Sequence, residues 1–181
     1  WKDVTFQNES VRYSVPEWII DGWNADYGRD VTEKMLEAFM QPAKITVRTN
    51  TQKCTPEELK DRLSQEGVTV EAIEGISYAF ALSGFDYLAG LGSFQDGWFY
   101  VQDISSMTVA HAADPKKGDY IIDVCAAPGG KSSHLAELLD GSGMVEARDL
   151  TEYKVGLIEE NILRHDLHNM KAVQQDATLF D

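Results

Sequence analysis

The fold is decided by the stretch Asp123-Val124-Cys125-Ala126-Ala127-Pro128-Gly129-Gly130-Lys131-Ser132. It follows an apolar run over 120–124 that predicts a buried strand, and it leads into a helical pattern over 131–139. Glycine and alanine allow a backbone to pass close to a ligand because they carry little or no side chain. The free N–H groups at the start of the helix can meet a polar or anionic group. The stretch therefore predicts a ligand-binding loop between a strand and a helix.

The residues after this loop continue to alternate between strand and helix. Strands are expected over 144–148 and 171–174, with a helix over 152–165 between them. This β-α-β-α-β order is typical of an α/β fold, the first half of a doubly wound parallel sheet of the Rossmann-like kind. Asp149 directly follows the second strand, and Asp176 lies just beyond the third.

These positions predict a nucleoside site at the carboxyl edge of the sheet. Asp149 lies 19 residues after Gly130, where an acidic side chain commonly accepts hydrogen bonds from ribose hydroxyls. Asp176 follows the third strand, where it could reach an adenine. The spacing G-x-G-x-x-G is absent, which disfavours a dinucleotide. A P-loop would need glycine at position 125, which is Cys125. One glycine cluster with these two carboxylates fits S-adenosylmethionine best.

Two side chains near the loop leave alternatives open. Asp123 at the end of the strand could be structural or could contact the loop. Lys131 could contact the carboxylate of the cofactor or simply be solvated. In an earlier strand, Arg48 and Asn50 could touch RNA, although exposed strand residues are the simpler interpretation.

The chain before the loop predicts two further parts. Residues 1–42 read as polar helices, and residues 43–114 read as a small α+β subdomain followed by a linking helix over 104–114. In that subdomain, strands are expected over 45–49, 68–73, 78–82 and 98–101. Its helix begins at Thr55, with Pro56 and Glu58 completing a capping box. Residues 115–181 form the third part.

Composition excludes several classes of protein. The 181 residues are 43% hydrophobic and 25% charged, which is ordinary for a chain with a buried core. The net charge of −14 argues against a protein whose whole surface binds phosphate groups, although it does not exclude a local basic patch. No apolar run approaches membrane-spanning length. The cysteines Cys54 and Cys125 form no CxxC pair, and His165 and His168 are expected at a solvated helix end, so no metal site is predicted. A reducing, cytoplasmic compartment is expected.

The stretch 123–132 resembles the cofactor motif of the Sun/Fmu (NOL/NOP/Sun) family of RNA 5-methylcytosine methyltransferases. The resemblance extends to residues 13–18, 48–51 and 99–107 upstream and to 160–161 and 175–177 downstream, so it covers nearly the whole chain. Within the family, the chain is most similar to the bacterial enzymes that act on 16S ribosomal RNA.

The resemblance implies a role for each part of the site. The methionine part of S-adenosylmethionine would be wrapped by Cys125, Ala126, Ala127, Pro128, Gly129, Gly130 and Lys131. Asp149 would bind the ribose, and Asp176 would lie near the adenine. Residues 43–103 would be an RRM-like RNA-binding subdomain, and residues 1–42 would lead in from an upstream helical RNA-binding domain. The expected partner is ribosomal RNA, in particular 16S, and the expected process is rRNA processing.

The chain departs from the family in lacking its catalytic cysteines. The family uses a cysteine in a Pro-Cys motif after strand four and a second cysteine after strand five, and no Pro-Cys occurs here. Because the covalent mechanism needs that thiolate, no catalytic residue is assigned, and Cys125 is expected to be a small loop residue. We therefore expect a fragment that lacks the C-terminal half of the enzyme, transfers no methyl group alone and leaves the edge of its first Rossmann strand bare. The alternatives are a non-catalytic cofactor- or RNA-binding module and an enzyme with another substrate.

Overall fold

The computed structural model describes residues 6, 8–41 and 44–180, and the chain divides into two compact units, Trp1–Ala43 and Lys44–Asp181. The first unit contains the helices α1 (Glu9–Tyr13), α2 (Glu17–Tyr27) and α3 (Arg29–Phe39). Its small core consists of Tyr13, Ile20 and Leu36. This agrees with the helical character expected for the N-terminal residues.

The second unit begins with a four-stranded antiparallel sheet in the order β2-β3-β1-β4. Its strands are β1 (Ile45–Thr49), β2 (Thr69–Ile73), β3 (Ile76–Ser83) and β4 (Phe99–Val101). The chain also forms α4 (Pro56–Gln65), the short helix η1 (Leu88–Gly90) and α5 (Gly92–Gln95). Helix α4 starts with the predicted capping box, in which Thr55 and Glu58 satisfy each other's backbone N–H groups. The expected α+β subdomain is confirmed.

The two faces of this sheet meet different neighbours. Val47 and Phe99 face a hydrophobic core that includes Leu59 and Leu63 of α4. Successive side chains of a strand point to opposite faces, so the neighbours of Val47 and Phe99 along the chain, Arg48 and Tyr100, face the other way. There they are buried against the helices of the next subdomain.

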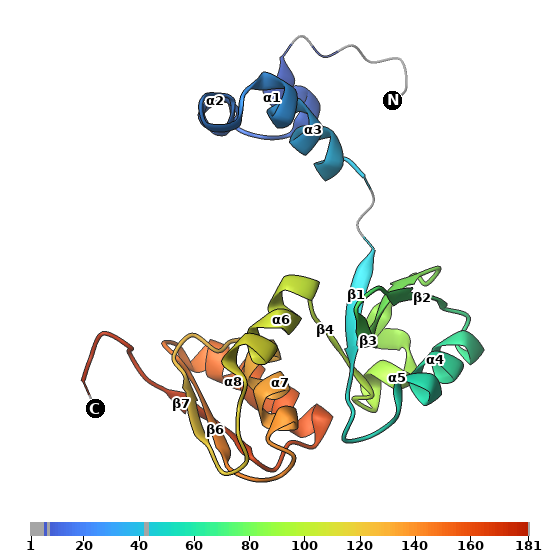
Figure 1. Ribbon diagram of the computed structural model, residues 1–181, viewed down its shortest axis with the longest axis vertical. Coiled ribbons are helices and arrows are strands. Elements are labelled where there is room, and N and C mark those ends of the chain that lie inside the picture. Colours follow the sequence, from blue (N-terminus) through green and yellow to red (C-terminus); the bar gives the residue numbers. More distant parts are fainter. Residues whose placement is uncertain (1–5, 7, 42–43, 181) are drawn as a thin grey trace. The chain divides into compact units, whose positions relative to one another are not determined.

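That next subdomain contains a parallel sheet in the order β5-β6-β7. Its strands are β5 (Tyr120–Asp123), β6 (Met144–Asp149) and β7 (Met170–Gln174), and its helices are α6 (Ile104–Ala113), α7 (Gly130–Leu138) and α8 (Glu152–His165). The three helices lie between the two sheets (Figure 1), with α7 and α8 packed on β6 and β7. The predicted α/β architecture with parallel strands is confirmed, and the boundaries of α8 match the prediction.

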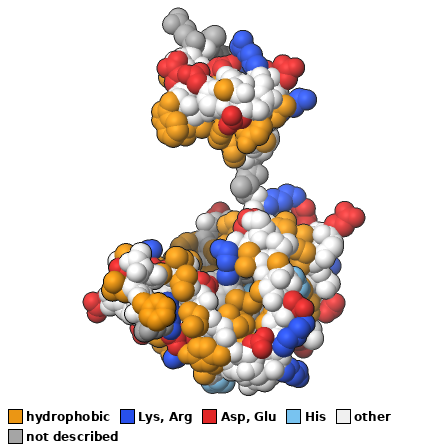
Figure 2. Space-filling model, turned by 60° about the vertical axis from the view of Figure 1, so that its left-hand side comes forward, with side chains coloured by type: hydrophobic (Ala, Val, Ile, Leu, Met, Phe, Trp, Pro, Cys, Tyr) orange, Lys and Arg blue, Asp and Glu red, His pale blue; other side chains and the backbone are white. Residues whose placement is uncertain are grey.

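Strand β5 differs from the buried strand that its apolar sequence predicts. Tyr120 is 57% exposed and Ile122 is 46% exposed. Among the described residues, β5 pairs only with β6, so it forms an edge of the sheet. The helices cover one face of this sheet, and Tyr120 and Ile122 lie on the other face. Apolar side chains also remain at the surface of the helical N-terminal unit (Figure 2).

A buried arginine joins the two sheets of the second unit. Arg48 in β1 is completely buried, and its Nη1 lies 2.6 Å from Oε2 of Glu137 in α7. Its Nη2 donates to the Ser133 hydroxyl at 3.2 Å, and its guanidinium lies 4.0 Å from the centre of the Tyr100 ring. The expectation that Arg48 is an exposed strand residue or an RNA contact is therefore wrong. Its charge is used inside the protein.

Asn50 and its neighbours close the same interface at the end of α8. The Asn50 side-chain amide donates to the carbonyls of Gly97 and His165 at 3.0 and 3.1 Å, and Lys53 Nζ donates to the carbonyl of Arg164 at 2.9 Å. The carbonyls of Arg164 and His165 lie in the last turn of α8, where helix carbonyls have no partners within the helix, and these donors satisfy them. Asn50 is fully buried, so its predicted alternatives, exposure or RNA contact, are also wrong.

Gly97 lies where the two subdomains of the second unit approach each other closely enough to exclude a side chain, so substituting it measures that approach. A Cβ at this position would lie 2.0 Å from the carbonyl oxygen of Arg164, and the φ angle is +68°. We expect Gly97→Ala to cost about 1–2 kcal/mol for the left-handed backbone and about 1–3 kcal/mol more for the clash. The matched control is Gly75→Ala, at φ +82° with nothing within 4 Å, which should cost only the backbone part. Urea unfolding measures both, and equal losses would contradict the close approach.

Removing Arg48 should leave Glu137 as a buried, unpaired carboxylate. We expect Arg48→Met to cost about 3–5 kcal/mol, and the Arg48→Met, Glu137→Met double variant to cost less than the single variant. Burial raises the pKa of Glu137, so the folded state of the single variant favours the protonated acid. Its stability deficit should therefore shrink as the pH falls through that raised pKa and grow as the pH rises. Unfolding curves at several pH values check this, and a deficit independent of pH would contradict it.

Candidate functional site

The predicted loop lies between β5 and α7 and is shaped by its glycines. Gly129 has a φ angle of +104°, which side chains rarely adopt, and a Cβ there would touch Met170 and Ile158 at 3.5–3.6 Å. The peptide bond between Ala127 and Pro128 is cis. Gly130 opens α7, and a Cβ on it would meet nothing within 4 Å. The loop therefore packs on the core at Gly129 and leaves space at Gly130.

Acidic side chains hold the loop from both sides. Asp123 accepts a hydrogen bond from the Cys125 N–H at 3.2 Å and from the Ser132 hydroxyl at 2.6 Å. Of the two alternatives left open for Asp123, the structure shows the contact with the loop. Asp149 accepts from the Ala127 N–H at 3.0 Å, and from the N–H of its neighbour Leu150 at 2.8 Å. The loop is thus attached to the ends of β5 and β6.

Helix α8 holds the loop at a third point. The Asn161 side-chain amide donates to the carbonyl of Pro128 at 2.8 Å. Lys154, in the first turn of the same helix, places its Nζ 3.0 Å from Asp149 Oδ1. Burial opposes ionisation of Asp149, but the hydrogen bonds from Ala127, Lys154 and Leu150 outweigh it and lower its pKa. The carboxylate is therefore charged at neutral pH.

One cavity brings together the two carboxylates predicted from the sequence. It has a volume of about 300 Å³, and its walls include Cys125, Ala127, Asp149, Lys154 and Asp176. Asp176 accepts hydrogen bonds from the hydroxyl and the N–H of Thr178 at 2.7 and 2.9 Å, which lower its pKa. The cavity thus lies at the carboxyl ends of all three strands, where ligands bind in open α/β sheets.

A second cavity of about 180 Å³ lies on the other side of the loop. Its walls are formed by the loop and by the junction between β4 and α6, and they include Gln102, Asp103, Ser106, Cys125, Ala126, Ala127, Pro128, Gly130 and Lys131. The first turn of α7 has no side-chain cap, so its N–H groups are available to a ligand. Cys125 and Ala127 line both cavities.

The wall formed by residues 101–106 was not assigned to the site from the sequence. The stretch 99–107 takes part in the family resemblance, but nothing in its spacing places it next to residues 125–131. Contact between them depends on the packing of α6 against α7. Lys154 was missed as well, because one lysine at a helix start has no distinctive pattern.

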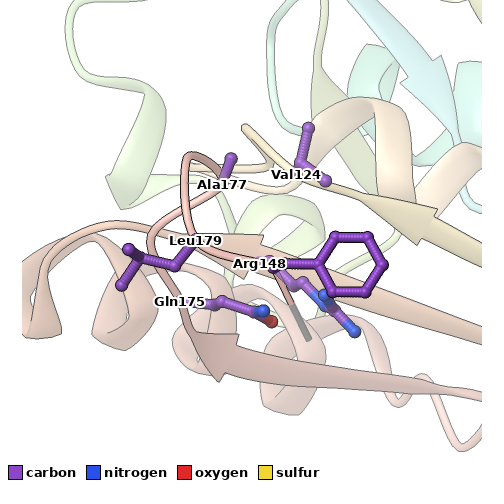
Figure 3. Close-up of a pocket in the computed structure, with 6 residues that line it drawn as sticks. Val124, Arg148, Gln175, Ala177 and Leu179 are labelled. Atoms are coloured by element: carbon purple, nitrogen blue, oxygen red, sulfur yellow. The ribbon is translucent and has the colours of Figure 1, made fainter.

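A third cavity adjoins the nucleoside side of the site (Figure 3). It has a volume of about 320 Å³ and is lined by Val124, Arg148, Gln175, Ala177, Leu179 and Phe180. Arg148 precedes Asp149 in β6, so its side chain points to the opposite face of the sheet. This cavity therefore belongs to the sheet face that α7 and α8 do not cover.

The histidines and cysteines do not form a metal site. His165 is fully buried and stacks on Tyr100 with 3.6 Å between ring centres, so the expected solvated helix end is wrong for this residue. Burial lowers its pKa to about 3. Cys54 is buried, which raises its pKa to about 11, whereas Cys125 is exposed. Within the described residues, no group of His, Cys, Asp and Glu side chains could hold a metal ion.

Figure 2 shows one face, on which basic side chains are scattered among acidic and apolar ones. For residues 6, 8–41 and 44–180, no helix is both long and apolar enough to cross a membrane.

Two family models match successive parts of the chain. Residues 15–85 match the RsmF/B-like methyltransferase ferredoxin-like domain, and residues 110–181 match the 16S rRNA methyltransferase RsmB/F model. The first match includes the antiparallel strands β1 to β3, and the second includes the loop and the parallel sheet.

Curated relatives agree with these matches over most of the chain. A probable ribosomal RNA small subunit methyltransferase B of Bacillus subtilis is 41% identical over 164 residues, which is 91% of this chain and 36% of the relative. The tRNA (cytosine(72)-C(5))-methyltransferase of Pyrococcus horikoshii is 41% identical over 109 residues, 59% of this chain and 28% of the relative. The matched residues thus span 36% and 28% of the lengths of these two relatives.

Solved structures show the same fold. A methyltransferase homologue from Pyrococcus horikoshii superposes with a TM-score of 0.77 at 27% identity, covering 92% of this chain and 54% of that one. NSun6 from the same organism, solved with SFG, superposes with a TM-score of 0.83 over 90% of this chain and 66% of that one. Its identity of 21% supports the fold alone. Two consecutive family matches, high identity to curated relatives and a shared fold lead to one conclusion: the chain belongs to the RsmB/F methyltransferase family.

Proposed function

We propose that this chain supplies the ferredoxin-like subdomain and the cofactor-binding half of an enzyme that methylates carbon 5 of cytosine in ribosomal RNA. The observation that carries the proposal is a pair of cavities that meet at Cys125 and Ala127 of the family's loop. One cavity has the carboxylates suited to a nucleoside, and the other has an uncapped helix start suited to an amino-acid group. S-adenosylmethionine, which supplies a methyl group, joins these two chemistries in one molecule.

The residues present fit this cofactor. Asp149 and Asp176 would hold the nucleoside, since both carboxylates line the larger of the two cavities. Residues 125–131 would wrap the methionine part, with Gly130 leaving room and Lys131 lining the wall. Asp149 also anchors the loop through Ala127, so it would couple the shape of the loop to nucleoside binding.

The catalytic thiol is proposed to lie outside residues 1–181. Carbon 5 of cytosine is a poor nucleophile until a thiolate adds to carbon 6, so the reaction needs a reactive cysteine. Cys54 is buried with a raised pKa, which keeps the thiol protonated and inaccessible. Cys125 belongs to the loop that would wrap the cofactor, and neither cysteine follows a proline. Residues 1–181 are therefore proposed to bind the cofactor without transferring its methyl group.

The RNA-binding role is proposed for the ferredoxin-like subdomain, with 16S ribosomal RNA in the bacterial cytoplasm as the substrate. Two relatives that match 91% and 89% of this chain are a probable ribosomal RNA small subunit methyltransferase B from Bacillus subtilis and a ribosomal RNA small subunit methyltransferase B from Pectobacterium carotovorum. Arg48 and Asn50 do not contribute to RNA binding in this proposal, because both are buried against the other subdomain. The division into 1–42, 43–114 and 115–181 remains a prediction.

A non-catalytic module that binds the cofactor or RNA is the second candidate. It is favoured by the same observation that neither cysteine within residues 1–181 has the setting of a nucleophile. The two candidates differ in one expected result. If the rest of a relative's methyltransferase domain is supplied, half of an enzyme would support methyl transfer, whereas a non-catalytic module would not.

Cofactor binding can be measured directly with S-adenosylhomocysteine. Calorimetric titration of the 181-residue chain should give saturable binding at one site. Asp149→Asn should weaken that binding at least about tenfold, since a charged acceptor is worth about 1.5–3 kcal/mol in a hydrogen bond. The matched control, Asp166→Asn, changes an exposed residue with a left-handed backbone that asparagine tolerates. Equal effects of both variants would contradict the proposed role of Asp149.

Methyl transfer should be undetectable with the 181-residue chain alone. Incubation with S-adenosylmethionine and unmodified 16S ribosomal RNA should give no 5-methylcytosine above the level of a Cys125→Ser variant, because the proposed nucleophile lies elsewhere. Mass spectrometry of digested RNA measures this. Formation of 5-methylcytosine that disappears in Cys125→Ser would assign the nucleophile to this loop and overturn the proposal.

A further inference from the structure

Gln102 is held at the end of β4 with its side chain in one orientation. Its backbone N–H donates to the Thr46 carbonyl at 3.1 Å, and its own carbonyl accepts from the Thr46 hydroxyl at 2.7 Å. Its side-chain Oε1 accepts from Arg48 Nε at 2.7 Å. An arginine can only donate, so the oxygen of the amide must be the atom that faces Arg48. The amide nitrogen Nε2 is therefore the atom that faces away from it.

That nitrogen is a buried donor without an acceptor. Gln102 is 5% exposed, and among the described residues its Nε2 has no hydrogen-bond partner. Buried donors in folded proteins nearly always have a partner, so an exception calls for an explanation. Gln102 lines the cavity of about 180 Å³ on the far side of the loop from Asp176. A ligand in this cavity could supply the missing acceptor.

The other groups in this cavity indicate what that ligand carries. The uncapped start of α7 favours a negative group, and Lys131 adds a positive charge on the same wall. Asp103 lines the cavity as well and offers a carboxylate to a positive group. The second carboxylate on this wall, that of Asp123, already accepts hydrogen bonds from the Cys125 N–H and the Ser132 hydroxyl. Donors and the Asp103 carboxylate around one small cavity match an amino acid, which carries an ammonium and a carboxylate on one carbon.

We propose that Gln102 donates its Nε2–H to the carboxylate of the methionine part of the cofactor, and that Arg48 is the positioning residue that orients the amide. This inference rests on the proposed function, because it requires the cofactor to occupy both cavities. Gln102 directly follows β4 and is hydrogen-bonded through its backbone to Thr46 of β1. In this proposal the ferredoxin-like subdomain therefore completes the cofactor site rather than only binding RNA. Arg48 links that contact to Ser133 and Glu137 in the helix that follows the loop.

The test compares two ligands that differ in the amino-acid part. S-adenosylhomocysteine contains the carboxylate, whereas 5′-methylthioadenosine has the same nucleoside and a thioether but no amino-acid group. Gln102→Glu keeps an acceptor for Arg48 and replaces the donor with a negative oxygen, while Gln102→Met removes the donor without adding charge. The matched control is Gln65→Glu, which adds the same charge at an exposed position of α4. Calorimetry on the 181-residue chain measures affinity for both ligands, and thermal melting confirms that each variant is folded.

We expect both Gln102 variants to weaken S-adenosylhomocysteine binding by about 10- to 100-fold, as for other hydrogen bonds to charged groups, and to change methylthioadenosine binding less than twofold. Gln65→Glu should change neither. Arg48→Lys retains a positive charge opposite Glu137 but loses the fixed geometry of the guanidinium, so it too should weaken S-adenosylhomocysteine selectively. A purely structural role for Arg48 would weaken both ligands equally.

The possible failures are distinguishable. If the unmodified chain binds S-adenosylhomocysteine and the Gln102 variants bind it equally well, or lose both ligands together, the inference is wrong while the proposed cofactor site stands. The inference is also wrong, while the proposed cofactor site stands, if the unmodified chain binds the two ligands with equal affinity. If it binds neither ligand, the proposed cofactor site fails and the inference fails with it.

Discussion

The second unit depends on one buried charge. Arg48 lies between an antiparallel and a parallel sheet with no exposure to solvent, and a guanidinium in that position is costly unless its donors are satisfied. Glu137 balances the charge, while Ser133 and Gln102 accept two further hydrogen bonds. Because these partners come from α7 and from the end of β4, the arginine is satisfied only when the two subdomains dock in one arrangement.

Other contacts extend this constraint along the interface. Tyr100 lies under the guanidinium and stacks on His165, which in turn faces the carbonyl of Phe99 at 3.2 Å. Gly97 permits the turn before β4 to approach the end of α8, where a side chain would collide with the carbonyl of Arg164. Among the described residues, docking therefore relies on stacking of Tyr100 and on capping of backbone carbonyls around the Arg48–Glu137 ion pair.

The docking also has a consequence for the ligand site. The loop over residues 125–131 is anchored by Asp123, Asp149 and Asn161, all of which belong to the parallel-sheet subdomain. The wall opposite it, at Gln102 and Asp103, comes from the other subdomain and its linking helix. A small shift at the interface would change the width of the cavity between them. The buried arginine thus sets the geometry of a cavity whose other wall is the cofactor loop.

The sequence by itself determined the loop and most of the elements, although it did not predict the short helices η1 and α5. The strand over 45–49, the capping box at Thr55 and the helix over 152–165 depend on neighbours a few positions apart, and the structure confirms all three. The glycine-rich stretch 123–132 likewise has a local meaning. Tertiary structure alone decided which side chains are buried against which neighbours. Arg48 and Glu137 are 89 residues apart in the sequence. An arginine in an alternating strand gives the same local pattern whether it faces water or a carboxylate. For the same reason, local patterns predicted an exposed His165 and a buried β5. Burial depends on which surfaces meet, and that information lies in contacts between segments remote in the chain.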